Sequence, residues 1–383
     1  MNILLTSYYP LPSLGGIWTF VSQLKNQLET FGHHVDILSL NQDNGNYRII
    51  GTEEIDKKTI EKRVRSLKRR QLRSRTQASA WIHNVELNRY RLQITACHQN
   101  LSSYDIIHAQ DVISASTISK IKRSQVPIVT SAHGYLSGAI FYNLKTRHPS
   151  HSDSEIKQFP EYKYHNALET EGYHASDLIH VQSQWMFHKI GNEFSVPANK
   201  LRTFPYALDH RRFFTKSDRS STIPRPQNKK VILFSGRLVY LKGIHHLIDA
   251  LGLLKQKRSD WVCWLLGEGE LEGALRAQCK QLGIEHDVQF LGVRNNVIDY
   301  LQQSDLFVLP SLQDTQPHSV MEAQVSGVPV IVSNASGLPE MVENGKTGLI
   351  TSAGDHEQLY KQINYLLDND SIRQQLGIHA KKW

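Results

Sequence analysis

The sequence predicts an α/β protein with two domains, each a doubly wound parallel sheet with helices on both faces. Three observations lead to this prediction. The 383 residues exceed one average domain. Short apolar runs alternate with helical periodicity in two separate series, and a polar segment at residues 215–230 lies between the two series.

The first series contains runs that are almost continuously apolar, as strands buried on both faces are. We predict strands at residues 2–7, 34–40, 105–109, 126–131 and 178–182. Helical periodicity supplies the connections at residues 17–31, 115–123 and 154–175. Residues 41–76 are polar and charged, and we interpret them as an insertion.

The second series repeats this alternation. We predict strands at residues 231–236, 261–266, 287–292, 306–310 and 328–332. Helices are expected at residues 244–255, 271–282 and 371–381. The segment between the series is rich in Ser, Pro, Arg and Lys, which is a linker composition. We therefore predict a first domain of residues 1–208 and a second of residues 209–383, with ligands bound at the carboxyl ends of the strands in a cleft between them.

Composition narrows the class of protein. Apolar residues make up 40% of the chain and charged residues 21%, as in soluble proteins. No stretch approaches the roughly 20 apolar residues that span a bilayer. The first predicted strand begins immediately after Met1, which leaves no room for a secretion signal. The three cysteines have no metal-binding spacing and an odd count, so we expect a reducing, cytoplasmic environment.

Positive charge is concentrated in one segment. The net charge is +8, and residues 53–75 contain ten Lys or Arg against four Asp or Glu. Ile60, Val64 and Leu67 fall on one helical face, which predicts a basic amphipathic helix. This helix could bind anionic lipid headgroups at a membrane surface, or its cations could simply face water. No aromatic residues are interleaved with the cations, which argues against nucleic acid as a partner.

Two glycine-containing segments follow predicted strands. Gly15 and Gly16 precede a helix, where the backbone can approach a ligand closely and free amides attract anions. Gly236 and Arg237 end a strand, and Lys242 lies where a helix begins. The planar guanidinium and the compact ammonium could together bind a diphosphate. The alternative is that the glycines only form turns and the cations only face solvent.

Residues 314–322 read Asp-Thr-Gln-Pro-His-Ser-Val-Met-Glu and carry two carboxylates, Asp314 and Glu322. The motif connects a strand to a helix, and we expect Pro317 in the first helical turn with Thr315 or Asp314 as the cap. Both carboxylates could accept hydrogen bonds from sugar hydroxyls. Alternatively, Asp314 is only a cap and Glu322 only faces the helix dipole.

One histidine stands out by its position. His133 follows a predicted strand and precedes Gly134. At the carboxyl end of a parallel strand it could bind a sugar hydroxyl or the acceptor. The chain has 19 histidines, so the position is the only reason to select this one.

Together these motifs resemble those of the large retaining glycosyltransferase family 4, whose members have the GT-B fold of two Rossmann-like domains. The resemblance covers most of the chain; its C-terminal motifs are specific in combination and its N-terminal motifs are looser. Further matching motifs lie at residues 205–209, 267–269, 327–330, 337–340 and 345–348.

The resemblance implies transfer of a sugar from a nucleoside diphosphate donor to a glycan or lipid-linked acceptor, with retained anomeric configuration and without a metal or other cofactor. It implies that Arg237 and Lys242 bind the diphosphate and that Glu322 binds the donor ribose. Asp314 is expected to contact the donor sugar, and His133 to lie near the transferred sugar. The expected substrate-binding residues also include Gly15, Gly16, Gly236, Ser319 and Val320.

The sequence departs from the family at several positions. Asp314 stands where Glu is usual, Gln316-Pro317 where Phe-Gly is commonest, and Ala207 where Gly is common. Members usually continue with a helix that crosses back onto the first domain, whereas this chain stops at Trp383, so we expect a shortened C-terminus.

Our leading hypothesis is a cytoplasmic, retaining hexosyltransferase of polysaccharide biosynthesis, peripheral to the membrane if the basic helix binds lipid. One alternative is a phosphorylase or epimerase of the same fold, although no motif for a lysine-bound pyridoxal phosphate is present. Another is a catalytically inactive sugar-binding or scaffold protein.

Overall fold

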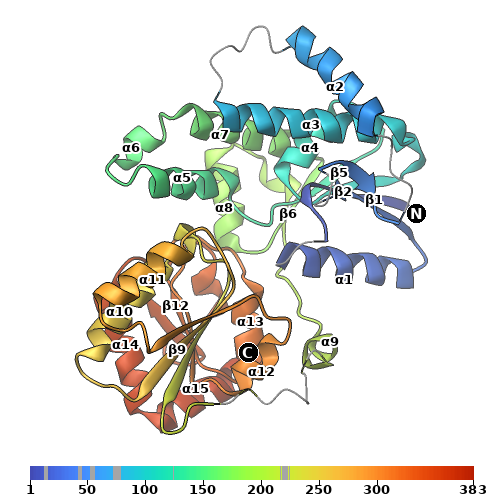
Figure 1. Cartoon of the computed structure of the whole chain (residues 1–383). Coiled ribbons are helices and arrows are strands. Elements are labelled where there is room, and N and C mark those ends of the chain that lie inside the picture. Colours follow the sequence, from blue (N-terminus) through green and yellow to red (C-terminus); the bar gives the residue numbers. More distant parts are fainter. Residues whose placement is uncertain are drawn as a thin grey trace. The chain divides into compact units, whose positions relative to one another are not determined.

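The computed structural model describes residues 1–12, 16–41, 45–51, 57–71, 79–123, 125–215, 217, 223 and 225–383. The chain divides into two compact units, Met1–Pro205 and Tyr206–Trp383 (Figure 1). Several residues of the predicted linker lie outside the described residues, namely 216, 218–222 and 224. None of the described helices combines the length and apolar character that crossing a bilayer requires.

The first unit is built on a seven-stranded sheet of order β3-β2-β1-β4-β5-β6-β7. The strands are β1 (Asn2–Pro10), β2 (His34–Leu40), β3 (Tyr47–Ile49), β4 (Ile106–Ala109), β5 (Ile128–Ser131), β6 (Leu178–Val181) and β7 (Leu201–Thr203). Neighbouring strands are parallel except β3, which pairs with β2 in the antiparallel sense. The interpretation of residues 41–76 as an insertion on the sheet pattern therefore missed an edge strand. Three residues are too few to show a strand periodicity, yet Tyr47 is fully buried and its hydroxyl donates to the Tyr8 carbonyl at 2.7 Å.

Helices cover this sheet. They are α1 (Gly16–Thr30), α2 (Lys57–Gln71), α3 (Ala80–His98), α4 (Val112–Ser119), α5 (Leu136–Arg147), α6 (Asp153–Ile156), α7 (Pro160–His174) and α8 (Gln184–Glu193). Helices α3, α4 and α7 pack against one another. The single helix predicted at residues 154–175 is two helices, α6 and α7. Pro160 explains the break, because proline lacks an amide donor and disfavours helical geometry at Phe159, whose ψ is 138°.

The second unit has a six-stranded parallel sheet of order β10-β9-β8-β11-β12-β13. Its strands are β8 (Lys230–Ser235), β9 (Trp261–Leu266), β10 (Val288–Gly292), β11 (Leu306–Leu309), β12 (Val330–Ser333) and β13 (Gly348–Thr351). Its helices are α9 (His210–Thr215), α10 (Ile244–Lys255), α11 (Glu272–Gln281), α12 (Val297–Gln302), α13 (His318–Val325), α14 (His356–Asp368) and α15 (Asp370–Lys382). Helix α10 packs against α11 and α14, and α13 packs against α15 (Figure 1). The predicted α/β class with two doubly wound sheets is confirmed.

The strand order fixes where functional loops gather. In the second unit the chain runs from β8 outward through β9 and β10 and then returns to β11 on the other side of β8. The loops that follow β8 and β11 therefore leave the same edge of the sheet side by side, at a topological switch point. In the first unit β1 and β4 flank the corresponding point.

A close backbone approach joins those two loops of the second unit. Gly243 is the N-cap of α10 and has a φ of 66°. A Cβ atom added there would lie 2.0 Å from the Pro310 carbonyl oxygen, which follows β11. Only glycine satisfies both the left-handed conformation and this contact.

A polar chain crosses three strands of the first sheet. His108 Nε2 lies 2.9 Å from Ser131 Oγ, and this hydroxyl lies 3.0 Å from His180 Nδ1. His180 Nε2 contacts the Phe204 carbonyl oxygen at 2.8 Å, so Nε2 donates and Nδ1 accepts. Burial away from solvent, and then the electrostatic effect of the neighbouring His180 ring, lower the pKa of His108 to about 4. Both histidine rings can therefore make these hydrogen bonds in the neutral form.

We predict that Gly243→Ala destabilises the second unit by more than about 2 kcal/mol, through left-handed strain and the clash with Pro310. The matched control is Gly273→Ala in α11, where an added Cβ meets nothing within 4 Å. That change should be neutral or stabilise by up to about 1 kcal/mol, because alanine favours helices. The difference is measured from the denaturant midpoint of the second unit, followed by the fluorescence of Trp261 and Trp264. Equal shifts of this midpoint in the two variants would contradict the prediction.

His108 predicts a pH dependence of stability. Its folded pKa lies below the ordinary value of 6.5, so below pH 6.5 the unfolded chain binds a proton that the folded chain does not. The wild type should therefore lose about 2 kcal/mol more unfolding free energy than His108→Gln between about pH 7 and pH 5. Urea titrations at each pH test this. His188→Gln, at an exposed position, should keep the wild-type profile, and a His108→Gln profile parallel to the wild type would refute the expectation.

Candidate active site

The loop after β8 carries the predicted cationic pair. The Gly236 amide donates to the Leu266 carbonyl at 2.9 Å, which holds the loop to the neighbouring strand β9. The Arg237 side chain is exposed. Lys242 ends a short 3-10 turn (Tyr240–Lys242) directly before Gly243, and its side chain is only 14% exposed.

Lys242 forms an ion pair with Asp314, whose side chain is also 14% exposed. Ser311 Oγ donates a second hydrogen bond to the same carboxylate oxygen at 3.2 Å. The Leu312 amide donates to the Leu241 carbonyl at 2.7 Å, so the backbones of the two loops are bonded together as well. Two motifs 72 positions apart in the sequence thus form one surface.

The start of α13 corrects one prediction. Helix α13 begins at His318, with Pro317 as its N-cap and no side-chain cap. The expectations that Pro317 lies in the first turn and that Thr315 or Asp314 caps the helix are therefore wrong. The Asp314 carboxylate instead accepts from Lys242, because a charged donor is a stronger partner than a backbone amide.

The other residues expected to bind the donor in the second unit, Ser319, Val320 and Glu322, lie on α13. Glu322 is on the second turn and is partly exposed, as is Ser319 on the first turn. The Val320 side chain is fully buried, and its amide donates to the Pro317 carbonyl at 3.2 Å. Any contact of Val320 with a substrate would therefore involve the backbone alone.

Sequence reasoning missed the role of Gln316. Its Oε1 atom accepts a hydrogen bond from the Tyr206 amide at 2.5 Å. The Tyr206 ring stacks on His318, with ring centroids 5.2 Å apart. Gln316, which departs from the family motif, and the neighbouring His318 thus hold the acidic loop against Tyr206, the first residue of the second unit. No signal in a single sequence indicates this pairing.

In the first unit His133 lies beyond the end of β5. His133 Nε2 is 3.0 Å from Gln110 Oε1, which follows β4, and the Phe20 ring packs edge-on at 5.0 Å between centroids. Gly16 is the exposed first residue of α1. Gly15 lies outside the described residues. Three side chains therefore meet at the carboxyl edge of the first sheet. His133 comes from the loop after β5, Gln110 from the loop after β4, and Phe20 from α1.

A buried carboxylate positions the segment after His133. Glu169 of α7 is fully buried and accepts hydrogen bonds from the Leu136 and Ser137 amides at 3.0 and 2.7 Å, from Ser137 Oγ, and from the Tyr173 hydroxyl. Burial raises the pKa of Glu169, and these hydrogen bonds act in the opposite direction. The amides belong to the start of α5, so Glu169 caps that helix from another helix. Sequence periodicity could not reveal a cap 32 positions away.

The chemistry of the second unit's loops fits an anionic, hydroxyl-bearing ligand. An exposed guanidinium and a partly buried ammonium offer charge-assisted donors to phosphate oxygens. The Asp314 and Glu322 carboxylates can only accept hydrogen bonds when ionised, and sugar hydroxyls supply suitable donors.

Comparisons with known proteins agree with this reading of both units. The family described as Glycosyltransferase Family 4 matches residues 14–212, and the family described as Glycosyl transferases group 1 matches residues 216–383. An uncharacterised glycosyltransferase of Methanocaldococcus jannaschii is 26% identical over 391 residues, covering 99% of this chain and 92% of the relative.

Solved structures share the fold. Sucrose-phosphate synthase from Thermosynechococcus elongatus aligns with a TM-score of 0.73 at 18% identity, over 100% of this chain and 93% of that chain. Anabaena HepE, in complex with UDP and glucose, aligns with a TM-score of 0.65 at 20% identity, over 100% and 94% of the two chains. The two sheets described above are thus the two Rossmann-like domains of a GT-B fold. The chain belongs to glycosyltransferase family 4.

Proposed function

We propose that this protein transfers a hexose from a nucleoside diphosphate sugar to a hydroxyl of a glycan or lipid-linked acceptor, with retention of configuration and without a metal in the transfer step. The observation that carries the proposal is the ion pair between Lys242 and Asp314 at the switch point of the second sheet, with the exposed Arg237 on the same loop as Lys242. Family membership and the UDP and glucose bound to HepE support a nucleotide sugar as donor.

The cations have a defined task in this reaction. Negative charge builds on the leaving diphosphate as the bond to the sugar breaks. Fixed positive charge from Arg237 and Lys242 stabilises that state more than the bound donor, which raises turnover rather than only affinity. In the absence of a donor, Asp314 balances the charge of Lys242, so the ammonium is held in place before the diphosphate binds.

The same contacts suggest how configuration is retained. The Asp314 carboxylate already accepts from Lys242 and Ser311, which suits it to hold the loop and a sugar hydroxyl rather than to attack the anomeric carbon. We therefore assign the deprotonation of the acceptor to the leaving phosphate on the same face of the sugar. Nuclear magnetic resonance of the product distinguishes retention from inversion, and an inverted product would exclude this route.

We predict that Arg237→Ala and Lys242→Ala each lower turnover at least about tenfold, because each removes a charge-assisted contact that strengthens in the transition state. Release of nucleoside diphosphate measures the rate, with the donor first chosen by a thermal-shift screen of UDP-, GDP- and ADP-sugars. Lys257→Ala, at an exposed position near the other end of α10, is the matched control and should retain the wild-type rate.

Two outcomes would decide against the proposal. Wild-type rates in both folded variants would remove the assigned role of the cations. Calorimetric binding of a nucleotide sugar by the wild type without hydrolysis or transfer would instead support a sugar-binding protein that lacks catalysis.

The basic helix α2 bears on the membrane proposal. Its apolar residues Ile60 and Val64 are buried against Ile94 of α3. They pack within the protein, so they are not available to insert into lipid. Exposed cations nevertheless cover the described part of the helix, namely Lys58, Lys62, Arg63 and Arg65. Residues 53–56 and 72–75 of the predicted basic segment, and the Leu67 side chain, lie outside the described residues. We therefore propose an electrostatic attachment to anionic headgroups without insertion of the helix.

This attachment predicts that the protein sediments with phosphatidylserine vesicles at low salt and is released at high salt, because salt screens exposed charges. Replacing Lys62, Arg63 and Arg65 by Glu should abolish sedimentation. Replacing the exposed Lys381 and Lys382 by Glu is the control and should not. If the wild type does not sediment at low salt, the cations of α2 simply face water.

A further inference from the structure

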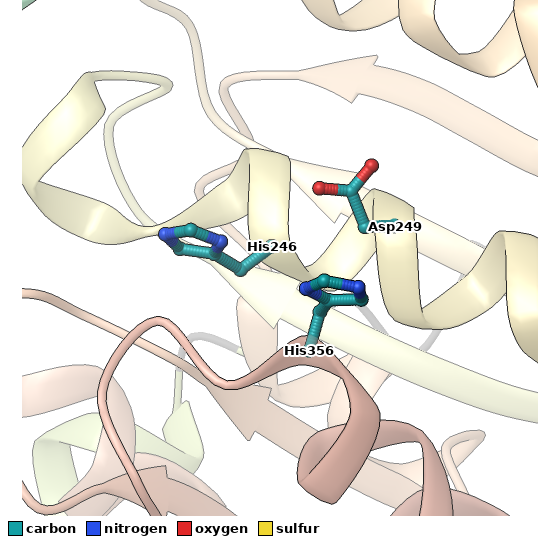
Figure 2. A group of neighbouring side chains, drawn as sticks. All are labelled: His246, Asp249 and His356. Atoms are coloured by element: carbon teal, nitrogen blue, oxygen red, sulfur yellow. The ribbon is translucent and has the colours of Figure 1, made fainter.

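A separate group of side chains of the types that ligate metal ions lies on the second unit. His246 and Asp249 project from adjacent turns of α10, and His356 is the first residue of α14 (Figure 2). One ligand atom from each residue lies within 4.8 Å of the other two. Residues three positions apart face the same side of a helix, and the packing of α10 on α14 brings in the distant histidine.

The surroundings of these side chains point to a missing ligand. The buried Nδ1 atom of His246 has no hydrogen-bond partner among the residues that the structure describes. Such an orphaned polar atom costs free energy unless something satisfies it. Among the residues that the structure describes, no hydrogen bond or ion pair joins these three side chains to one another. An added Cβ at Gly354 would lie 3.6 Å from His246 Nε2, an ordinary van der Waals distance, so Gly354 packs beside the other nitrogen of the ring.

A further residue supports the carboxylate. Gln278 of α11 donates to Asp249 Oδ1 at 2.6 Å and to the His245 carbonyl at 3.0 Å. This fixes one carboxylate oxygen and leaves the other for a ligand. Outer contacts of this kind orient the ligands of protein metal sites.

We propose that His246, Asp249 and His356 bind a divalent transition metal ion of the Zn²⁺ class, with water completing the coordination. Two imidazoles and one carboxylate suit Zn²⁺, whereas Mg²⁺ and Ca²⁺ prefer oxygen ligands. Tetrahedral zinc needs ligand atoms about 3.3 Å apart, so the side chains, whose ligand atoms lie within 4.8 Å of one another, have to rotate inward to bind the ion. Helix α10 begins directly after Gly243, at the end of the loop that carries Lys242. The ion therefore links the start of this helix to α14. It takes no part in sugar transfer.

Calorimetry on metal-free protein tests the proposal. Zn²⁺ should bind in a 1:1 ratio and Mg²⁺ should not bind. His246→Ala and His356→Ala should each weaken Zn²⁺ binding at least tenfold. His286→Ala is the matched control, because that side chain is 94% exposed outside the cluster, and it should bind like the wild type.

Three further measurements exclude misfolding and nonspecific binding by other histidines as explanations. Circular dichroism establishes that each variant is folded. Co²⁺ should give the intense visible absorption of a tetrahedral site in the wild type, and His356→Ala should lack it. Zn²⁺ should also raise the melting temperature of the wild type but not of His356→Ala. Undiminished Zn²⁺ binding in both folded histidine variants, or no binding by the wild type, would overturn the assignment.

Discussion

The contact between the loop after β8 and the loop after β11 is the constraint on which the candidate site depends. Gly243 lets the two backbones meet at the Pro310 carbonyl, and the amide of Leu312 bonds to Leu241. These backbone contacts give Lys242 and Asp314 fixed positions before any ligand binds. A charge that is already in place does not have to be reoriented during the reaction, which is how preorganised sites lower barriers.

Buried polar groups play the equivalent part in the first unit. Glu169 caps α5 from α7, and Gln110 holds the His133 ring at the carboxyl edge of the sheet. Each polar group has a partner that is distant in the sequence, so the loops of the candidate site are supported by the core. The proposed metal ion would act similarly on α10, by tying the helix that follows the Lys242 loop to α14.

Much of the fold follows from apolar periodicity. The strands at residues 34–40 and 261–266 and the helix at residues 244–255 were predicted with the bounds that the structure gives them. These segments are long and mostly buried, so local composition and tertiary environment agree. The edge strands β3, β7 and β13 and the helices α3, α5, α8, α9, α12 and α14 were not predicted. Strands of three or four residues carry too little periodicity. Residues 136–147 mix polar and apolar residues, and the start of this helix is stabilised by Glu169, which lies outside the segment.

The sequence by itself determined the family, the doubly wound architecture and the identity of the charged motifs, because strands buried on both faces and glycine-bearing turns leave local signatures. Only the tertiary structure decided which side chains meet. It paired Asp314 with Lys242 instead of with the helix start, joined Gln316 to Tyr206, and gathered His246, Asp249 and His356. Such pairings depend on strand order and helix packing, which bring together residues about 70 to 110 positions apart, and no local periodicity records them.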